Sequence, residues 1–275
     1  MKINHNIPAL RTLNQLAHTN KNAQKTMLRL SSGLRINSSS DDAAGMAIAQ
    51  KMDSQIKGLD QANRNSLDAI SLVQIAEGAY NEVHSILQRM RELSIQSAND
   101  TNDELDKEAI QTEIDELTRE IEAIMNQTEF NKKPLLSENV GDIPIQTGAN
   151  KDQMMNMDFS LVNLKTNVLD VIEDIDVVTS QETSQRAIAQ LDQAIENASA
   201  SRSQLGSYQN RLEYTVTNLN TSEENMTASL SRIQDADMAE EMANFTRYNI
   251  LSQAATAMLA QANQRPQQVL QLLQR

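Results

Sequence analysis

The sequence has few of the residues from which most globular domains build their cores and loops. Its 275 residues include no Cys and no Trp, with only 7 Gly, 4 Pro and 3% aromatic residues. A compact domain normally anchors its core on aromatic residues and punctuates its loops with Gly and Pro. The core must therefore come from aliphatic residues and the 13 Met, and the shortage of helix breakers predicts very long helices.

These absences also exclude several classes of function. Without Cys there is no disulfide, no thiol catalysis and no Cys-ligated metal. A net charge of −13, from 24 Lys and Arg against 37 Asp and Glu, repels phosphate backbones and argues against nucleic-acid binding. No apolar run reaches the length of a secretory signal or a membrane span. We expect no membrane insertion and, if the chain is exported, no cleaved signal.

The sequence offers no constellation for catalysis. His5, His18 and His84 lie far apart, without the spacing of metal ligands, and no phosphate-binding loop or nucleophile motif is present. Two adjacent carboxylate pairs, Asp41-Asp42 and Glu240-Glu241, would diverge on a helix, so we interpret them as solvated charge. We therefore predict no enzyme, no catalytic residues, no metal site and no cofactor.

Helical periodicity dominates the chain. One heptad series predicts a helix between residues 46 and 98, a second predicts an antiparallel arm, and a third predicts a long helix after residue 179. A second apolar stripe beside the first indicates more than one packing partner. The main series are Val73, Ala76, Tyr80, Val83, Leu87 and Met90; Ile110, Ile114, Leu117, Ile121 and Ile124; and Ile188 to Ile233.

The pattern changes between about residues 130 and 178. Ile143, Ile145 and Thr147 alternate with polar or Pro positions, and a second alternation follows at Met155, Met157 and Phe159. We predict a small β-hairpin region with its turn near residues 150–152. This segment is too short for an independent catalytic domain.

The two ends of the chain each form one helix with a narrow apolar face. Such helices do not stay folded alone, so we expect them to pair with each other and to bury what remains against other copies. They would be disordered in a free monomer. The expected contacts of these helices are Leu13, Leu16, Met27, Leu30, Leu251, Ala255 and Met258.

The predicted fold is mainly α: a long antiparallel helical rod with a small β-hairpin region and paired terminal helices. We divide the chain into an N-terminal helix with its connector (1–45), the first two rod helices with the hairpin region (46–178), the third rod helix (179–235) and a C-terminal helix (236–275).

An ordered series of short motifs resembles bacterial flagellin across nearly the whole chain. Each motif is weak alone, but together they are specific. They are the opening MKINHN, LSSGLRIN at 30–37, DDAAG at 41–45, LQRMREL at 87–93, QTEFN at 127–131, SRIQDAD at 231–237, LAQANQ at 259–264 and the final LLQR.

The resemblance implies a structural protein. Flagellins pair their terminal helices as an inner coiled coil, travel through the flagellar type III export channel and polymerise beneath a cap into the secreted, extracellular filament used for swimming. Only about 50 residues separate the helical halves here, so the variable outer domains of larger flagellins are expected to be absent. By the same resemblance, a flagellar export chaperone binds the C-terminal helix, and hook-associated proteins are further partners. The alternative within this neighbourhood is a hook–filament junction protein, which assembles in only a few copies, and a helical adaptor is a more distant one.

One surface patch has two interpretations. Gln88, Arg89 and Leu93 on the first long helix and Glu113 on the antiparallel arm could form an ordinary solvated surface, with Arg89 paired to a carboxylate. Their types also match the positions that, by resemblance to flagellins, contact the vertebrate flagellin-sensing Toll-like receptor. We therefore expect receptor recognition here.

Overall fold

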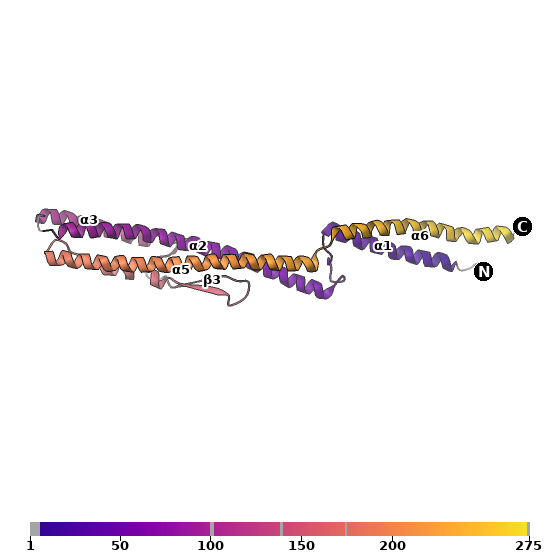
Figure 1. The fold of residues 1–275 in the computed structure, drawn as a ribbon, viewed down its shortest axis with the longest axis horizontal. Coiled ribbons are helices and arrows are strands. Elements are labelled where there is room, and N and C mark those ends of the chain that lie inside the picture. Colours follow the sequence, from indigo (N-terminus) through magenta and orange to yellow (C-terminus); the bar gives the residue numbers. More distant parts are fainter. Residues whose placement is uncertain (1–5, 100–101, 138–139, 174, 274–275) are drawn as a thin grey trace. The chain divides into compact units, whose positions relative to one another are not determined.

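The computed structural model describes residues 6–99, 102–137, 140–173 and 175–273, and side chains as far as residue 264. These residues form two compact units, one from residues 1–55 and 224–275 and one from residues 56–223, called below the terminal unit and the rod unit. The division passes through two helices that belong to both units, α2 (Ala43–Ser97) and α5 (Gln181–Gln234). Figure 1 shows the elements in the order of the chain.

In the terminal unit, α1 (Ile7–Ser32) lies against α6 (Met238–Leu273) (Figure 1). The Asn6 side chain accepts a hydrogen bond from the Ala9 N–H and so caps the start of α1. Pro8 fits the first turn because an N–H at that position would have no partner within the helix. Gly33 ends α1 in the left-handed conformation, with φ of 72°. The predicted pairing of the two ends is confirmed.

In the rod unit, α2 and α5 run beside α3 (Glu104–Gln127), which is the predicted antiparallel arm. Asp103 caps α3, and Glu104 and Asp106 lie in its first turn, where the helix dipole favours carboxylates. The predicted seam of α2 is buried without interruption from Val73 to Met90 at its heptad positions. Residues of α5 at the matching spacing, including Leu191, Ala198, Leu205 and Leu212, are buried as well.

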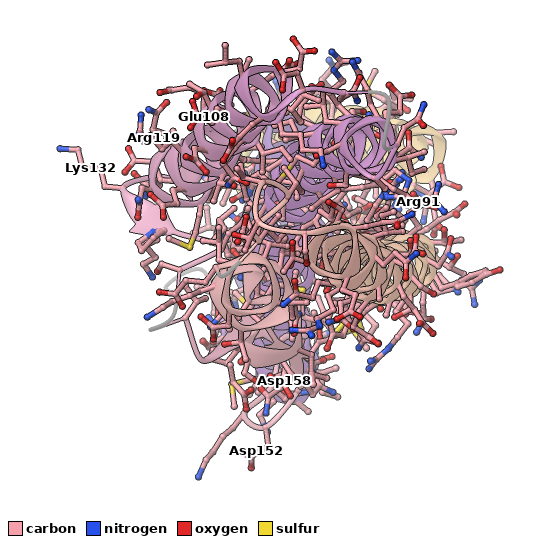
Figure 2. All side chains as sticks on the ribbon, turned by 90° about the vertical axis from the view of Figure 1, so that its left-hand side faces the viewer. Arg91, Glu108, Arg119, Lys132, Asp152 and Asp158 are labelled. Carbon is pink, nitrogen blue, oxygen red and sulfur yellow. The ribbon has the colours of Figure 1, made fainter. Side chains whose placement is uncertain are left out.

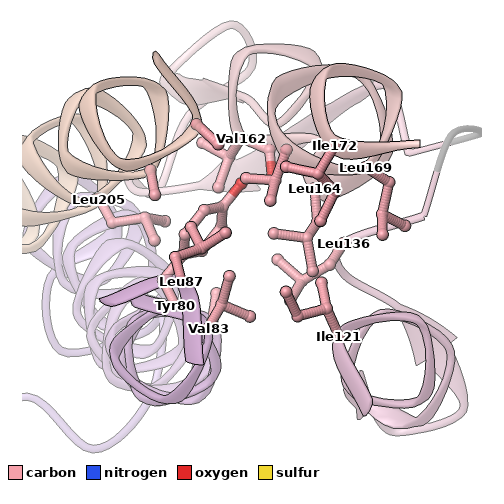
Figure 3. Packing of buried hydrophobic residues seen from close by; sticks show 14 of the residues in the cluster. Tyr80, Val83, Leu87, Ile121, Leu136, Val162, Leu164, Leu169, Ile172 and Leu205 are labelled. Atoms are coloured by element: carbon pink, nitrogen blue, oxygen red, sulfur yellow. The ribbon is translucent and has the colours of Figure 1, made fainter. Parts of the chain in front are cut away.

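The core of the rod unit is one aliphatic cluster with a few aromatic side chains (Figure 3). Tyr80 of α2 is fully buried, and its hydroxyl donates a 2.7 Å hydrogen bond to the Val162 carbonyl. Burial raises the pKa of Tyr80 to about 12, because the phenolate would lose its hydration. Phe159 is also fully buried. These two aromatic side chains therefore fill the core where the helices and the irregular segment meet.

The predicted hairpin is formed by β3 (Asp142–Gln146) and β4 (Met154–Asp158), which are antiparallel, with Ile143 opposite Met157 and Ile145 opposite Met155. Met155 and Met157 point into the core, as their alternation predicts. The hairpin lies close to α2, because a Cβ on Gly58 would come within 2.8 Å of Ala149 Cβ. A helix-interior glycine is thus required here by the close approach of the hairpin.

Several short elements have no periodic signal in the sequence. They are a two-residue strand pair, β1 (Glu129–Phe130) with β2 (Lys133–Pro134), a 3₁₀ turn at Ser160–Val162, a π-helical turn at Lys165–Leu169 and the short α4 (Asp170–Ile172). Side chains hold this region to the helices. The Gln111 amide, for example, donates to the Ile175 carbonyl and accepts from the Val177 N–H, much as a neighbouring strand would.

Candidate assembly surface on the terminal helices

The face of α1 that meets α6 is small and partly polar. Its covered positions follow a heptad spacing, and the two that are fully buried, Thr19 and Thr26, are threonines. Each threonine hydroxyl donates to the carbonyl four residues earlier in its own helix, so neither forms a bond to α6. The covered positions with this spacing are Ala9, Thr12, Leu16, Thr19, Ala23, Thr26 and Leu30, and Asn22 and Arg29 beside them are also half-buried.

The facing side of α6 mixes aromatic, aliphatic and small residues. Glu241 is buried, and the half-buried positions that follow it keep a heptad spacing: Phe245, Tyr248, Ser252, Ala255, Leu259 and Ala262. Polar contacts join the helices at two further levels, where the Asn6 amide donates to the Ala262 carbonyl and the Ser252 hydroxyl donates to Asn20 Oδ1. Within the described part of α1 and α6, no apolar side chain is fully buried.

Outside the pairing face, each helix carries large apolar side chains that this chain does not cover. Leu13 and Met27 of α1 are 50% and 53% exposed, and Leu251 and Met258 of α6 are 45% and 63% exposed. We call these apolar residues the exposed rows. The rows are Ile7, Leu10, Leu13, Met27 and Leu28 on α1, and Met238, Met242, Ile250, Leu251 and Met258 on α6.

The structure therefore divides the predicted terminal contact residues into two groups. Leu16, Leu30 and Ala255 are half-buried in the α1–α6 pair. Leu13, Met27, Leu251 and Met258 lie in the exposed rows. The predicted contacts were all apolar residues and did not include the threonines of the pairing face. The regular spacing of these threonines, every seven residues, could have indicated them.

Carboxylates that the sequence suggested were merely solvated have structural partners. Asp41 Oδ1 lies 2.7 Å from Lys25 Nζ, and Asp41 Oδ2 accepts from the backbone N–H groups of Asn37 and Ser38. The bond with Lys25 is the main reason that the pKa of Asp41 is lowered. Asp42 accepts from the N–H groups at the start of α2, so the connector between α1 and α2 is organised by this carboxylate pair.

The patch predicted to face a receptor lies in the rod unit. Arg89 Nη2 and Nε donate to Glu113 Oε1 at 2.9 and 3.2 Å, and Arg89 Nη1 donates to Glu92. Glu113 is the main reason that the pKa of Arg89 is raised further. Gln88 is exposed and contacts His84, whereas Leu93 is only 2% exposed and belongs to the core. Three of the four predicted residues thus share the surface, and the fourth lies beneath it.

Among the described residues, no three His, Asp or Glu side chains are grouped so that they could hold a metal ion. In the same part of the chain, no helix is both long and apolar enough to cross a membrane.

Comparison with known proteins agrees with this architecture. Residues 3–140 match the bacterial flagellin N-terminal helical region and residues 188–273 match the C-terminal helical region. The chain is 52% identical to a flagellin of Halalkalibacterium halodurans over 274 residues, covering 99% of this chain and all of that relative.

Two solved structures resemble the fold. Bacillus cereus flagellin aligns with a TM-score of 0.52 and 29% identity over 61% of this chain and 94% of that one. A putative flagellar hook-associated protein from Vibrio parahaemolyticus aligns with a TM-score of 0.61 over 71% of this chain and all of that one, but its 14% identity speaks for the fold alone. Two family regions at the two ends and a full-length relative with the same short middle lead to one conclusion: the chain belongs to the bacterial flagellin family and is a structural subunit of the flagellar filament.

Proposed function

We propose that copies of this chain pack together in the filament through the exposed rows of α1 and α6. The observation that carries the proposal is the contrast between two faces of the same helices. On the face used within the chain no apolar side chain of the described residues is fully buried, and the buried ones are Thr19, Thr26 and Glu241. By contrast, Leu13, Met27, Leu251 and Met258 are 45–63% exposed. Burying one Leu or Met side chain contributes about 1.5–3 kcal/mol, so covering the rows in a polymer supplies the stabilisation that the isolated pair lacks.

Seeded polymerisation tests this surface. Purified chain is added to short filament fragments, and growth is followed by light scattering and electron microscopy. Leu13→Gln and Leu251→Gln are expected to slow elongation strongly, because each places an amide in an interface that would otherwise be apolar. Leu105→Gln is the matched control, since Leu105 of α3 is 74% exposed and lies outside the terminal helices. Elongation of both row variants at the wild-type rate would contradict the proposal.

The chain reaches the filament, in this proposal, by flagellar type III export and adds beneath the cap, and hook-associated proteins are further partners. Before assembly, the exposed row of α6 binds a flagellar export chaperone. The support is that Met238, Met242, Leu251 and Met258 are 45–63% exposed and lie outside the half-buried heptad positions of α6 that face α1. We expect Leu251→Gln or Met258→Gln to weaken binding of the full chain to the chaperone in calorimetry, and Leu13→Gln to leave it unchanged. Deletion of residues 266–275 without loss of chaperone binding or polymerisation would argue against this role of the C-terminal helix.

The junction-protein alternative makes a different prediction for the same seeded reaction. A subunit of the filament extends each seed into a long polymer, whereas a junction protein adds a few copies and stops. Capped seeds without further growth would favour the junction role. We also propose that the chain has no catalytic activity.

The patch of Gln88, Arg89 and Glu113 is proposed as the contact for the vertebrate flagellin-sensing Toll-like receptor, with Leu93 supporting it from the core. Arg89 presents a guanidinium already fixed by two carboxylates, and such charge-assisted groups serve as anchors in interfaces. Arg89→Ala monomers are expected to lose most receptor signalling. Arg119→Ala is the control, because Arg119 is an exposed, carboxylate-paired arginine on the neighbouring helix α3. Equal signalling by Arg89→Ala and wild-type monomers would remove this proposal.

A further inference from the structure

The two terminal helices differ sharply in charge. α1 carries Arg11, Lys21, Lys25 and Arg29 and no acidic residue, so a carboxylate that pairs with these cations must come from another segment. Along the whole of α6, acidic residues occur only at Glu240 and Glu241 in the first turn. A cation on α1 can therefore meet a carboxylate of α6 at one level of the pair.

An ion pair forms at that level in the structure. Arg29 Nη1 lies 2.8 Å from Glu241 Oε1, and the two side chains are 25% and 11% exposed. Among the described residues, Glu241 is the only charged residue in the buried class. A carboxylate removed from water in this way needs its partner, because breaking a buried pair leaves an uncompensated charge.

The remaining contacts between α1 and α6 discriminate weakly between registers. On α1 the covered positions recur every three or four residues, and the buried Thr19 and Thr26 bond only to their own helix. A displacement by one helical turn would therefore keep the same stripe of α1 against α6. The pair is antiparallel, as the contacts of Asn6 with Ala262 and of Asn20 with Ser252 show, so such a displacement would shift every level of the exposed rows.

In one displaced register, a second cation of α1 could pair with Glu241. Lys25 lies one turn before Arg29 on α1, and sliding the helices by one turn would offer Glu241 to Lys25. In the structure Lys25 is held by Asp41 at 2.7 Å, and Asp41 is itself fixed by the connector backbone at Asn37 and Ser38. The ion pair with Asp41 therefore keeps Lys25 from pairing with Glu241 in the displaced register.

We propose that Arg29 and Glu241 are positioning residues that set the register of α1 on α6, and that the Asp41–Lys25 pair suppresses the register displaced by one turn. The register decides which residues of the two exposed rows lie at the same level, so the inference deepens the proposed assembly through those rows. A single buried polar pair in an otherwise tolerant helix seam is a known way to specify register.

Cysteine cross-linking measures the register directly, because the natural chain has no Cys. Asn20→Cys with Ser252→Cys reports the observed register, in which these side chains are in contact. Leu16→Cys with Ser252→Cys reports the register displaced by one turn toward Lys25. Each reporter is oxidised in filaments grown from a minority of variant full-length chains and an excess of wild-type chains, so that variants are carried into the polymer.

The expected result is a redistribution between the reporters. Arg29→Gln should raise the ratio of displaced to observed cross-links by about tenfold, the ratio that loss of one charge-assisted hydrogen bond produces. Lys25→Gln added to Arg29→Gln should remove the displaced cross-link again, and Arg29→Lys should stay near wild type. The charge-swapped chain, Arg29→Glu with Glu241→Arg, should restore both the observed cross-link and incorporation into filaments.

Two outcomes would overturn the proposal. One is an unchanged cross-link ratio in Arg29→Gln, which would mean that the backbone bridge between Leu34 and Asp235 sets the register without the ion pair. The other applies if Arg29→Gln is not incorporated: failure of the charge-swapped chain to recover incorporation would show that the pair has no register role. Either result would leave the row substitutions Leu13→Gln and Leu251→Gln unaffected, so the two proposals fail separately.

Discussion

The rod unit and the terminal unit are built from the same kind of helix but stabilised in opposite ways. The rod unit buries a continuous aliphatic cluster together with Tyr80 and Phe159, whereas the described part of α1 and α6 buries two threonines and one glutamate. Charge is divided as well. Residues 56–223 hold 13 Lys and Arg against 29 Asp and Glu, a net charge of −16, while the terminal unit holds 11 against 8, a net charge of +3.

This difference separates folding from assembly. The rod unit buries its main apolar cluster within one chain, although Leu105 and Tyr214 remain exposed. Its charged side chains point into solvent, as Figure 2 shows for Glu108, Arg119 and Lys132. The terminal helices leave the exposed rows uncovered, and in the proposed assembly other copies of the chain cover them. A helical protein can thus keep its monomer soluble and its polymer cohesive by placing the two requirements in different segments.

The largest expected effect is in hydrogen exchange of the monomer. Amides of α2, α3 and α5 within the rod unit should exchange only by global unfolding, which for a domain stability of about 5 kcal/mol slows exchange by several thousandfold. Amides of α1 and α6 should exchange almost as fast as those of an unfolded chain. In filaments both regions should be protected. Strong protection of α1 and α6 in the free monomer would break the comparison between the two units.

Removing a core side chain should affect the two units unequally. Phe159→Ala is expected to lower the free energy of unfolding of the monomer by about 3–5 kcal/mol, because it leaves a large cavity. Leu16→Ala in the terminal pair should change the same quantity by less than about 0.5 kcal/mol. Urea denaturation followed by circular dichroism measures both. A similar loss in the two variants would show that the terminal pair contributes to monomer stability.

Ionisation of Tyr80 should make the free energy of unfolding of the rod unit fall at high pH. Tyr80→Phe leaves the Val162 carbonyl without its donor and should cost about 1–2 kcal/mol at neutral pH. The pKa of Tyr80 is raised to about 12 in the folded rod from an ordinary value near 10, so the contribution of the protonated hydroxyl is complete below pH 10 and is lost as the pH rises through 12. Wild-type stability should therefore fall by roughly 2–3 kcal/mol more than that of Tyr80→Phe between pH 10 and 12. Parallel pH profiles for the two chains would show that Tyr80 ionises normally.

The smallest effects come from two glycines in α2. Gly78 has open space where a Cβ would point, so Gly78→Ala should raise the free energy of unfolding of the rod by about 0.5–1 kcal/mol through helix propensity alone. Gly58→Ala should instead lower it, because the new Cβ would meet Ala149 at 2.8 Å and displace the hairpin. Thermal unfolding of both variants gives the sign. Stabilisation by Gly58→Ala would mean that the hairpin does not need the close contact.

Much of this architecture could be predicted from the sequence, because long heptad series have few alternatives. The seam from Val73 to Met90 and the alternation of Met155 and Met157 both appear in the structure as written in the chain. The pairing face of α1 was harder to predict. Periodicity identifies a helix, but a large apolar residue at a heptad position can still remain exposed. Thr19 and Thr26 are buried because the helices approach closely there, which is a property of the pair and not of either helix.

Single side chains on predicted sites depended on details that periodicity does not contain. Arg89 and Glu113 come together because α3 folds back on α2 at the right level, and Leu93 turns inward from the same stretch that exposes Gln88. The partnership of Lys25 with Asp41 needs a connector whose backbone folds around the carboxylate. Turn chemistry of that kind is local, but its partner lies on another element.

The antiparallel bridge between Leu34 and Asp235 has a mechanical consequence. The segment just after α1 lies beside the segment just before α6. Backbone hydrogen bonds join the two segments, from the Arg35 N–H to the Gln234 carbonyl and from the Ala236 N–H to the Gly33 carbonyl. Tension applied to the terminal pair is therefore shared by two covalent strands that are cross-braced at their base. A pull on either terminal helix alone would therefore load both connecting strands through these backbone bonds.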